Sequence, residues 1–285
     1  MEERTIKKVI ESENYLLILL ILTQKKMKNK VIIMLSLMLV STLIISCCCK
    51  SEKNEECQGK QIYEWRIYTL TGDGTVLDDF FKETLIPAYN RYEISIGAFS
   101  LFKQEQDKPE QRYLLFVYPN LKSYNEIRQA IWNDADFQDA AAPFFEATAP
   151  NPVYSDYETY LCEAFDKIPE IRIPDKNRSL FEYRCYHSPN EDANKRKIKM
   201  FNTEEIDLFD KTGINSVCYG EILSGKNMPA LIYLTWHIDE DTRNEAWSAF
   251  GNHPDWALMK SKPEYKNTAT NNKVQLLSPM PYSQF

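Results

Sequence analysis

A six-residue sequence, Tyr63-Glu64-Trp65-Arg66-Ile67-Tyr68, returns in altered form as Phe181-Glu182-Tyr183-Arg184-Cys185-Tyr186. The two glutamates lie 118 residues apart (182 − 64 = 118). Each sequence alternates aromatic or apolar residues with charged or polar ones, which is the period-two pattern of a β-strand. A strand that recurs at this distance indicates that a whole folding unit is duplicated.

Other segments recur in the same order at nearly the same distance. Ser123-x-x-Glu126 returns as Thr242-x-x-Glu245, 119 residues later (242 − 123 = 119). Both match the capping box at a helix start, so we expect Ser123 and Thr242 to be N-caps. The segment Asn133–Phe137 returns as Asn252–Trp256 at the same distance. We therefore predict two repeats.

The predicted organisation has five parts. They are a removable signal or extension at 1–46, a tether at 47–60, a first repeat at 61–165, a linker at 166–177 and a second repeat at 178–285. The linker is placed where Pro169 and Pro174 interrupt the pattern.

Each repeat is predicted to have the order βαββαβ of the ferredoxin-like unit. In the first repeat we expect strands at Ile62–Leu70, Ile94–Lys103, Tyr113–Tyr118 and Tyr157–Cys162, with helices beginning at Thr75 and Ser123. In the second repeat the first helix is expected at 194–211, broken near Asn202-Thr203 and ended by Gly213.

The predicted fold class is α+β. A four-stranded ferredoxin-like sheet is covered by helices on one face only, and its other face must also be buried. Two fused repeats can pack these bare faces together, which gives an eight-stranded, intrachain version of the dimeric α/β-barrel.

The chain resembles the NIPSNAP family. The resemblance rests on Tyr63–Tyr68, on Phe181–Arg184 and on the helix end Trp247-x-x-Phe250…Pro254-x-Trp256, in that order. It implies the dimeric α/β-barrel fold. The wider fold group includes cofactor-free oxygenases, isomerases and haem enzymes, so the fold alone does not choose a function.

The N-terminal region resembles the signal of a bacterial lipoprotein. Met27-Lys28-Asn29-Lys30 is followed by the 15-residue apolar run Val31–Ile45 and by Ser46-Cys47. The run is shorter than the ~20 residues that span a bilayer. We expect translation to start at Met27 and lipid to be attached to Cys47. Because Cys48 rather than Asp follows Cys47, the resemblance to bacterial lipoproteins implies sorting to the outer membrane of the cell envelope.

Composition argues against several classes of function. The net charge is −7, and Lys195-Arg196-Lys197, the densest basic cluster, is typical of a solvated helix face, so no nucleic acid partner is expected. The three histidines do not have metal-ligand spacing. No nucleotide or dinucleotide fingerprint is present, and we expect no cofactor. Cys162, Cys185 and Cys218 lie in strand-like runs and are predicted core residues.

The candidate ligand site is predicted in the barrel interior. Because Tyr63, Trp65 and Ile67 share the apolar face of their strand, that face is expected to meet helices and the charged face to meet the interior. The residues assigned to the interior site are Glu64, Arg66, Tyr68, Tyr118, Glu182, Arg184, Tyr186, Tyr233 and His237.

Two interpretations of these residues stay open. The glutamates and arginines can be structural pairs, or the arginines can hold an acidic ligand with His237 as a proton carrier. The predicted function is a lipid-anchored envelope protein that binds a small molecule or a protein partner. The alternative is an enzyme that uses the barrel interior, such as a cofactor-free oxygenase or isomerase. Whether the chain forms homo-oligomers is left open.

Overall fold

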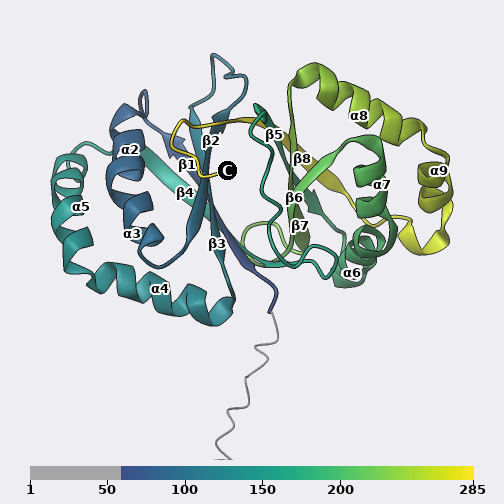
Figure 1. Cartoon of the computed structure of the whole chain (residues 1–285), viewed down its shortest axis with the longest axis horizontal. Helices are drawn as coiled ribbons and strands as arrows, with labels where there is room; N and C mark the ends of the chain where they lie inside the picture. The colour runs from purple at the N-terminus through teal and green to yellow at the C-terminus, as the bar shows by residue number, and fades with distance from the viewer. Residues whose placement is uncertain (1–58) are drawn as a thin grey trace, which may run out of the picture. The chain divides into compact units, whose positions relative to one another are not determined.

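Eight antiparallel strands close into a barrel in the order β1-β3-β2-β8-β5-β7-β6-β4, with helices outside it (Figure 1). The computed structural model describes residues 59–285. Read around the barrel, the first half contributes β4-β1-β3-β2 and the second half β8-β5-β7-β6. The two halves thus share one strand order, which confirms the predicted pair of ferredoxin-like units.

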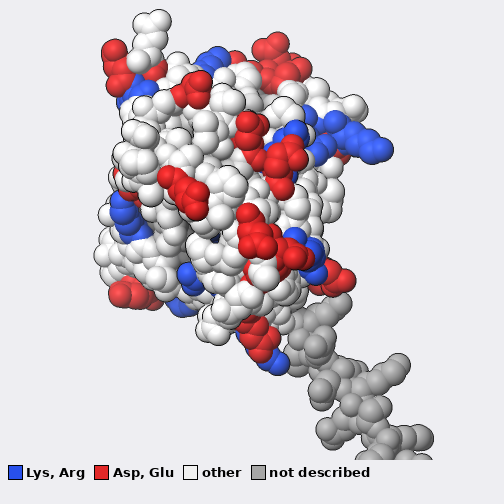
Figure 2. All heavy atoms as spheres, turned by 90° about the vertical axis from the view of Figure 1, so that its left-hand side faces the viewer, with Lys and Arg blue, Asp and Glu red and all other residues white. Residues whose placement is uncertain are grey.

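The first half contains four strands and two groups of helices, one between its first and second strands and one between its third and fourth. Its elements are β1 (Ile62–Leu70), α2 (Thr75–Phe80), the π-helical segment η1 (Phe81–Leu85), α3 (Ile86–Asn90), β2 (Ser95–Leu101), β3 (Gln111–Tyr118), α4 (Leu121–Asn133), α5 (Ala135–Thr148) and β4 (Tyr154–Ala164). Helices α2–α5 cover one side of the barrel in Figure 1. Acidic and basic side chains are both scattered over this helical face (Figure 2).

The second half repeats the plan. Its elements are β5 (Leu180–His187), α6 (Glu191–Met200), the π-helical segment η2 (Phe201–Glu205), α7 (Ile206–Thr212), β6 (Asn215–Ser224), β7 (Ala230–His237), α8 (Glu240–Asn252), α9 (Pro254–Ser261), the 3-10 turn η3 (Pro263–Tyr265) and β8 (Asn271–Pro279). The break expected near Asn202-Thr203 is the segment η2, and Gly213, with φ of +82°, ends α7 as predicted.

The helix caps lie three residues before their predicted positions. Asn120 caps α4 by accepting a hydrogen bond from the Ser123 amide at 2.9 Å. Asp239 caps α8 by accepting from the Thr242 amide, and the Thr242 hydroxyl accepts from the Asp239 amide in return. Ser123 and Thr242 are therefore third residues of their helices, and their assignment as N-caps was wrong. Asn and Asp in extended conformation are among the strongest N-cap residues, so the helices begin after Asn120 and Asp239 rather than after Ser123 and Thr242.

The strand faces are the reverse of those predicted. Trp65 meets Tyr183 with ring centres 5.1 Å apart, and Phe99 meets Phe181 at 4.8 Å, so aromatic rings from both halves touch inside the barrel. The interior cluster includes Tyr63, Trp65, Ile67, Phe99, Tyr113, Leu115, Phe181, Tyr183, Ile232, Leu234 and Leu277. Glu64, Arg66, Tyr68 and their counterparts lie instead between sheet and helices.

The reversal has a physical reason. Both faces of every strand are covered, one by the opposite sheet and one by helices, so period-two alternation cannot tell which face is inside. An eight-stranded barrel is just wide enough to be filled by side chains. Charged groups are stabilised on the outer face, because the helices supply hydrogen-bond partners there.

Two further predictions concern cysteines and the N-terminal region. Cys162, Cys185 and Cys218 are buried and unpaired, which confirms their assignment to the core. Within residues 59–285, no helix is long and apolar enough to cross a membrane. The predicted lipid attachment at Cys47 lies outside the described residues.

Candidate functional site

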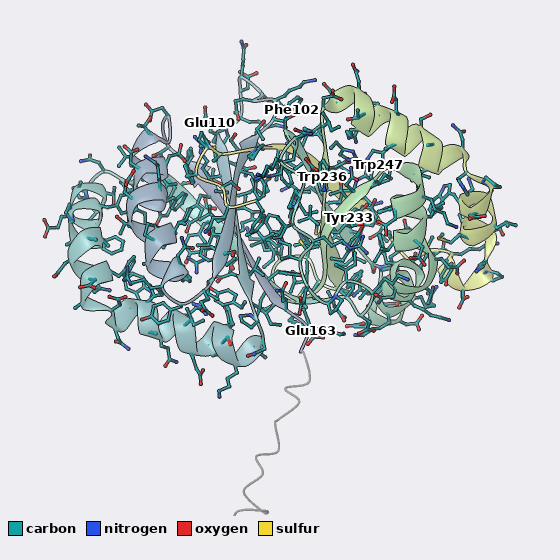
Figure 3. The ribbon with its side chains drawn as sticks, in the orientation of Figure 1. Phe102, Glu110, Glu163, Tyr233, Trp236 and Trp247 are labelled. Carbon is teal, nitrogen blue, oxygen red and sulfur yellow. The ribbon has the colours of Figure 1, made fainter. Side chains whose placement is uncertain are left out.

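The predicted site residues form two separate clusters, one under the helices of each half. Glu64, Arg66, Tyr68 and Tyr118 belong to the first half, and their ligand-binding role in a common interior site is not supported by this placement. Glu182, Arg184, Tyr186, Tyr233 and His237 lie together in the second half. In Figure 3, Tyr233 and Trp247 lie toward the helices of that half, whereas Trp236 lies toward the barrel.

The first cluster is a closed ion pair. Arg66 donates from Nε and Nη2 to the two oxygens of Glu64, at 2.8 and 3.1 Å, and the Tyr118 hydroxyl donates to Glu64 at 3.0 Å. The guanidinium also reaches the Tyr89 hydroxyl and lies 4.2 Å from the centre of the Phe116 ring. Burial alone would lower the pKa of Arg66, but the charge and hydrogen bond of Glu64, together with Tyr68 and Tyr89, hold that pKa well above its usual value. This mutual satisfaction favours the interpretation of Glu64 and Arg66 as a structural pair.

Aromatic rings fill the space beside this pair. Tyr68 stacks on Tyr157 with ring centres 4.9 Å apart and meets Tyr154 edge-on at 5.1 Å. Phe80 stacks on Phe144 at 4.0 Å in the layer above. The first half therefore packs its outer face with its own side chains.

The second cluster gathers two cations around one carboxylate. Glu182 is fully buried and accepts from Arg184 at 2.7 Å, from Arg243 at 2.9 and 2.8 Å, and from the indole of Trp247 at 2.7 Å. Burial would raise the pKa of Glu182, but the hydrogen bonds and charges of Arg243 and Arg184 hold that pKa below its usual value. One positive charge is left over, because two guanidinium groups share one carboxylate.

Arg184 links this cluster to a pair of tyrosines. Its Nη1 donates to the Tyr186 hydroxyl at 2.8 Å, and its guanidinium lies 3.7 Å from the centre of the Trp247 ring. The Tyr233 hydroxyl also donates to Tyr186 at 2.8 Å. The Tyr186 oxygen thus accepts twice, and within the described part of the chain its own proton goes to no acceptor, so it is available to a ligand.

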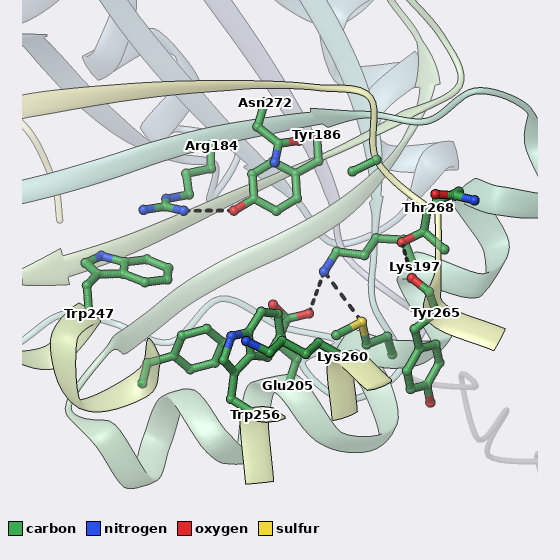
Figure 4. Close-up of a pocket in the computed structure, with 14 residues that line it drawn as sticks. Arg184, Tyr186, Lys197, Glu205, Trp247, Trp256, Lys260, Tyr265, Thr268 and Asn272 are labelled. Carbon is green, nitrogen blue, oxygen red and sulfur yellow. Dashed lines mark hydrogen bonds and ion pairs between the residues drawn. The ribbon is translucent and has the colours of Figure 1, made fainter. Parts of the chain in front are cut away.

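A pocket of about 420 Å³ opens beside Arg184 and Tyr186 (Figure 4). It lies between the outer face of β5 and β8 and the helices α6, α8 and α9. The residues that line it are Arg184, Tyr186, Lys197, Met200, Glu205, Trp247, Phe250, Trp256, Lys260, Tyr265, Asn267, Thr268, Ala269 and Asn272. The sequence analysis did not predict a site at this place, although it included two of the lining residues, Arg184 and Tyr186, among its candidates.

A buried ion pair forms part of the pocket wall. Lys197 Nζ lies 2.8 Å from Glu205 Oε2, and the two residues are 6% and 3% exposed. The same ammonium lies 3.6 Å from the sulfur of Met200 and 4.6 Å from the centre of the Phe201 ring. The interpretation of Lys195–Lys197 as a solvated face holds for Lys195 but is wrong for Lys197.

The first repeat shows which residues occupy the equivalent positions in the other half of the barrel. The π-helical segments align Phe201 with Phe81 (201 − 81 = 120), and so align Lys197 with Leu77 and Glu205 with Leu85. Both leucines are buried. A buried ion pair is seldom more stabilising than apolar residues of similar size, so the pair points to a role other than stability.

Strand register identifies a second difference. Tyr68 pairs with Tyr157 across β1 and β4, whereas the equivalent Tyr186 pairs with Asn272 across β5 and β8. In the first half the tyrosine ring covers its neighbour. In the second half the short amide of Asn272 leaves Tyr186 at the pocket wall.

His237 lies near this site but not in it. It is 1% exposed, its Nε2 is 3.8 Å from Glu182, and this nitrogen has no hydrogen-bond partner among the described residues. Burial lowers its pKa to about 4, against a smaller opposite effect of Glu182. At neutral pH the imidazole is uncharged. The predicted proton carrier is not among the pocket-lining residues, so it has no direct path to a ligand there.

No metal centre is evident in the described region, where no group of three or more His, Cys, Asp or Glu side chains is arranged to hold an ion. What the second half can do chemically is bind through cations, a free phenol proton and aromatic walls.

Comparison with known proteins supports the resemblance stated above. Residues 181–284 match the model of the NIPSNAP family, so the second repeat is a NIPSNAP domain. No curated protein matches the chain.

Several solved structures are similar. A proposed monooxygenase from Fusobacterium nucleatum is 10% identical, with 78% of this chain and 93% of that chain aligned and a TM-score of 0.51. One from Lactobacillus acidophilus is 12% identical, with 77% and 94% aligned and a TM-score of 0.52. A NIPSNAP family protein of unknown function from Agrobacterium tumefaciens is 17% identical, with 39% and 96% aligned and a TM-score of 0.34. At these identities the first two show a common fold.

Proposed function

We propose that this chain, whose residues 181–284 form a NIPSNAP domain, binds a small anionic molecule in the pocket of its second repeat. The observation that carries the proposal is the buried Lys197–Glu205 pair at an open pocket, where the first repeat has two buried leucines. A buried ion pair usually stabilises the fold no more than apolar residues of similar size do. Its presence beside the pocket is therefore better explained by ligand binding than by stability.

The charge around the pocket favours an anion. Three cations and one carboxylate line the pocket, and behind its wall a fourth cation bonds to a second carboxylate, which leaves an excess of two positive charges (4 − 2 = 2). The groups counted are Arg184, Lys197, Lys260, Arg243, Glu182 and Glu205. The whole chain carries −7, so this local excess is not a by-product of composition.

The first repeat supplies the test. Replacing the pair with its counterparts, Lys197→Leu with Glu205→Leu, is expected to keep or raise the melting temperature, since buried ion pairs are often replaced by apolar residues without loss. Small molecules that copurify with the wild-type chain, measured by mass spectrometry, are expected to be lost. The control is Lys167→Leu with Asp207→Leu, an ion pair outside this pocket. Full retention of the copurifying molecules by the first variant would overturn the proposal.

An enzyme that uses the same pocket is the second candidate, and Tyr186 favours it. A phenol that accepts from Arg184 and Tyr233 and keeps its proton free can donate to negative charge that develops on a ligand. The test incubates the copurifying molecules with wild-type chain and with Tyr186→Phe. A mass change with the wild type alone supports catalysis, and identical masses contradict it.

We also propose that the protein is located in the cell envelope and is anchored there by lipid on Cys47. Its support is the order of basic residues, the apolar run Val31–Ile45 and Ser46-Cys47 in the sequence. Several acyl chains hold a protein firmly on a bilayer, because each buried CH₂ contributes roughly 0.8 kcal/mol. Cys47→Ala is expected to shift the protein from the outer-membrane fraction to the soluble fraction or to block its processing. An unchanged fraction and mass would contradict the anchor.

A further inference from the structure

We propose that the ligand of the second-repeat pocket is a planar aromatic anion, such as an arylcarboxylate with one or two rings. This inference rests on the proposed function and narrows it to a chemical class.

The walls of the pocket are suited to a flat ring. Trp247 and Trp256 are half-buried and so present part of their surface to the pocket, together with Tyr186 and Tyr265. Arg184 lies 3.7 Å from the Trp247 ring centre, which holds that indole in place. Aromatic side chains pack best with other rings in stacked or edge-to-face geometry. Aliphatic ligands would forgo these contacts.

The polar groups are suited to an anionic oxygen. Lys197 donates one strong hydrogen bond to Glu205. Because an ammonium group has three N–H donors, Lys197 can also donate to a ligand. The Tyr186 hydroxyl accepts two hydrogen bonds and donates to no acceptor among the described residues. Lys260 is exposed and forms no ion pair with any residue of 59–285. Carboxylate oxygens accept from such groups in short, charge-assisted hydrogen bonds.

The geometry brings the two features together. Figure 4 shows Arg184 and Tyr186 on one side of the pocket, with Trp256, Lys260 and Glu205 on the opposite side. A ring between them would have indole and phenol surfaces beside it and cations within reach of its carboxylate. A pocket of about 420 Å³ is at the small end for organic ligands, which limits the ligand to one or two rings.

The test is titration calorimetry of the full chain with four probes. They are naphthoate, naphthylmethanol, cyclohexanecarboxylate and naphthylmethylamine, which vary charge and aromaticity separately. We expect naphthoate to bind at least about tenfold more tightly than the neutral alcohol and the non-aromatic acid, with the amine weakest.

Two single substitutions separate the contributions. Lys260→Gln is expected to weaken naphthoate about tenfold and leave the alcohol unchanged, since Lys260 is an exposed cation of the pocket. Trp256→Leu is expected to remove the preference for naphthoate over cyclohexanecarboxylate. Lys266→Gln, an exposed lysine that does not line the pocket, is the control and should change neither affinity.

The outcomes distinguish this inference from the proposed function. Equal affinity for naphthoate and either the alcohol or the non-aromatic acid overturns the ligand class, as does binding of no probe. In both cases the proposed function stands if the Lys197→Leu, Glu205→Leu variant still loses its copurifying molecules. Retention of those molecules by that variant overturns the function itself.

Discussion

Glu64 and Glu182 are equivalent buried carboxylates that are neutralised in different ways. Glu64 has one cation, Arg66, and one phenol, Tyr118. Glu182 has two cations, Arg184 and Arg243, together with an indole N–H. The second carboxylate therefore has a spare cation, and Arg184 can face a ligand without leaving Glu182 uncompensated.

This difference gives a matched pair of predictions. Arg66→Met is expected to lower the free energy of unfolding by about 3 kcal/mol, because it leaves the Glu64 charge buried without a cation. Arg184→Met is expected to cost roughly 1–2 kcal/mol, since Arg243 still neutralises Glu182. Urea unfolding of both variants measures the difference. Adding Glu64→Gln to Arg66→Met should recover much of the loss. Equal costs for the two arginines would argue against a spare cation.

His237 predicts how stability depends on pH. Its folded pKa of about 4 lies below the usual 6.5, so the unfolded state takes up a proton first as the pH falls. The contribution of the neutral imidazole is fully present above pH 6.5 and is lost between pH 6.5 and 4. The loss amounts to at most about 3 kcal/mol.

The control for this effect comes from the first repeat, where Tyr118 occupies the equivalent position and donates to Glu64. His237→Tyr is expected to flatten the fall in unfolding free energy between pH 7.5 and 4.5. Chemical denaturation at the two pH values measures it. Parallel pH profiles in wild type and variant would show that His237 does not titrate as described.

At the scale of elements, the helix starts depend on residues that the repeat pattern obscured. Asn120 and Asp239 are the caps, whereas Ser123 donates only its amide and Thr242 completes a capping box. Asn120→Ala and Asp239→Ala are each expected to cost about 1 kcal/mol. Ser123→Ala is expected to be neutral within about 0.5 kcal/mol, and Thr242→Ala to fall between these values. Thermal unfolding of the four variants ranks them. A Ser123→Ala cost that equals that of Asn120→Ala would contradict the assignment.

The strands and their order could be predicted because duplication preserves them. The predicted strand Ile62–Leu70 has the observed bounds, and both halves have the predicted order of elements. The facing of the strands could not be predicted, because an aromatic face is equally suited to the barrel interior and to a helix layer. The facing is determined by where the partners of the charged residues lie. Arg243 on α8, for example, bonds to Glu182 and so keeps the charged face of β5 toward the helices.

The pocket could not be predicted for a different reason. It arises from differences between the repeats, whereas sequence comparison of the repeats seeks what they share. Lys197 lies in a run of three basic residues, a pattern that predicts a surface position. Its burial becomes evident only when the π-helical segments are aligned and Leu77 is found at the same place.

At the scale of the whole molecule, the two repeats depend on each other through the barrel interior. Trp65 from the first half contacts Tyr183 from the second, and Phe99 contacts Phe181. Each repeat alone would expose an apolar sheet face to water. Exposed apolar faces of this kind are associated with self-association.

The expected consequence is that the second repeat, produced alone as residues 178–285, forms a homodimer in which a second copy replaces the first half. The reason is that its inner face, with Phe181, Tyr183, Ile232 and Leu234, needs an apolar partner of the same shape. Sedimentation equilibrium measures the mass. Tyr183→Glu should prevent dimerisation and, with it, cooperative unfolding, because a carboxylate would be buried without a cation. The outer-face substitution Lys195→Glu, as the control, should leave the dimer intact. A folded monomeric fragment would show that the interior does not hold the repeats together, and the interdependence of the two halves would then have to lie in the seams between β2 and β8 and between β4 and β6.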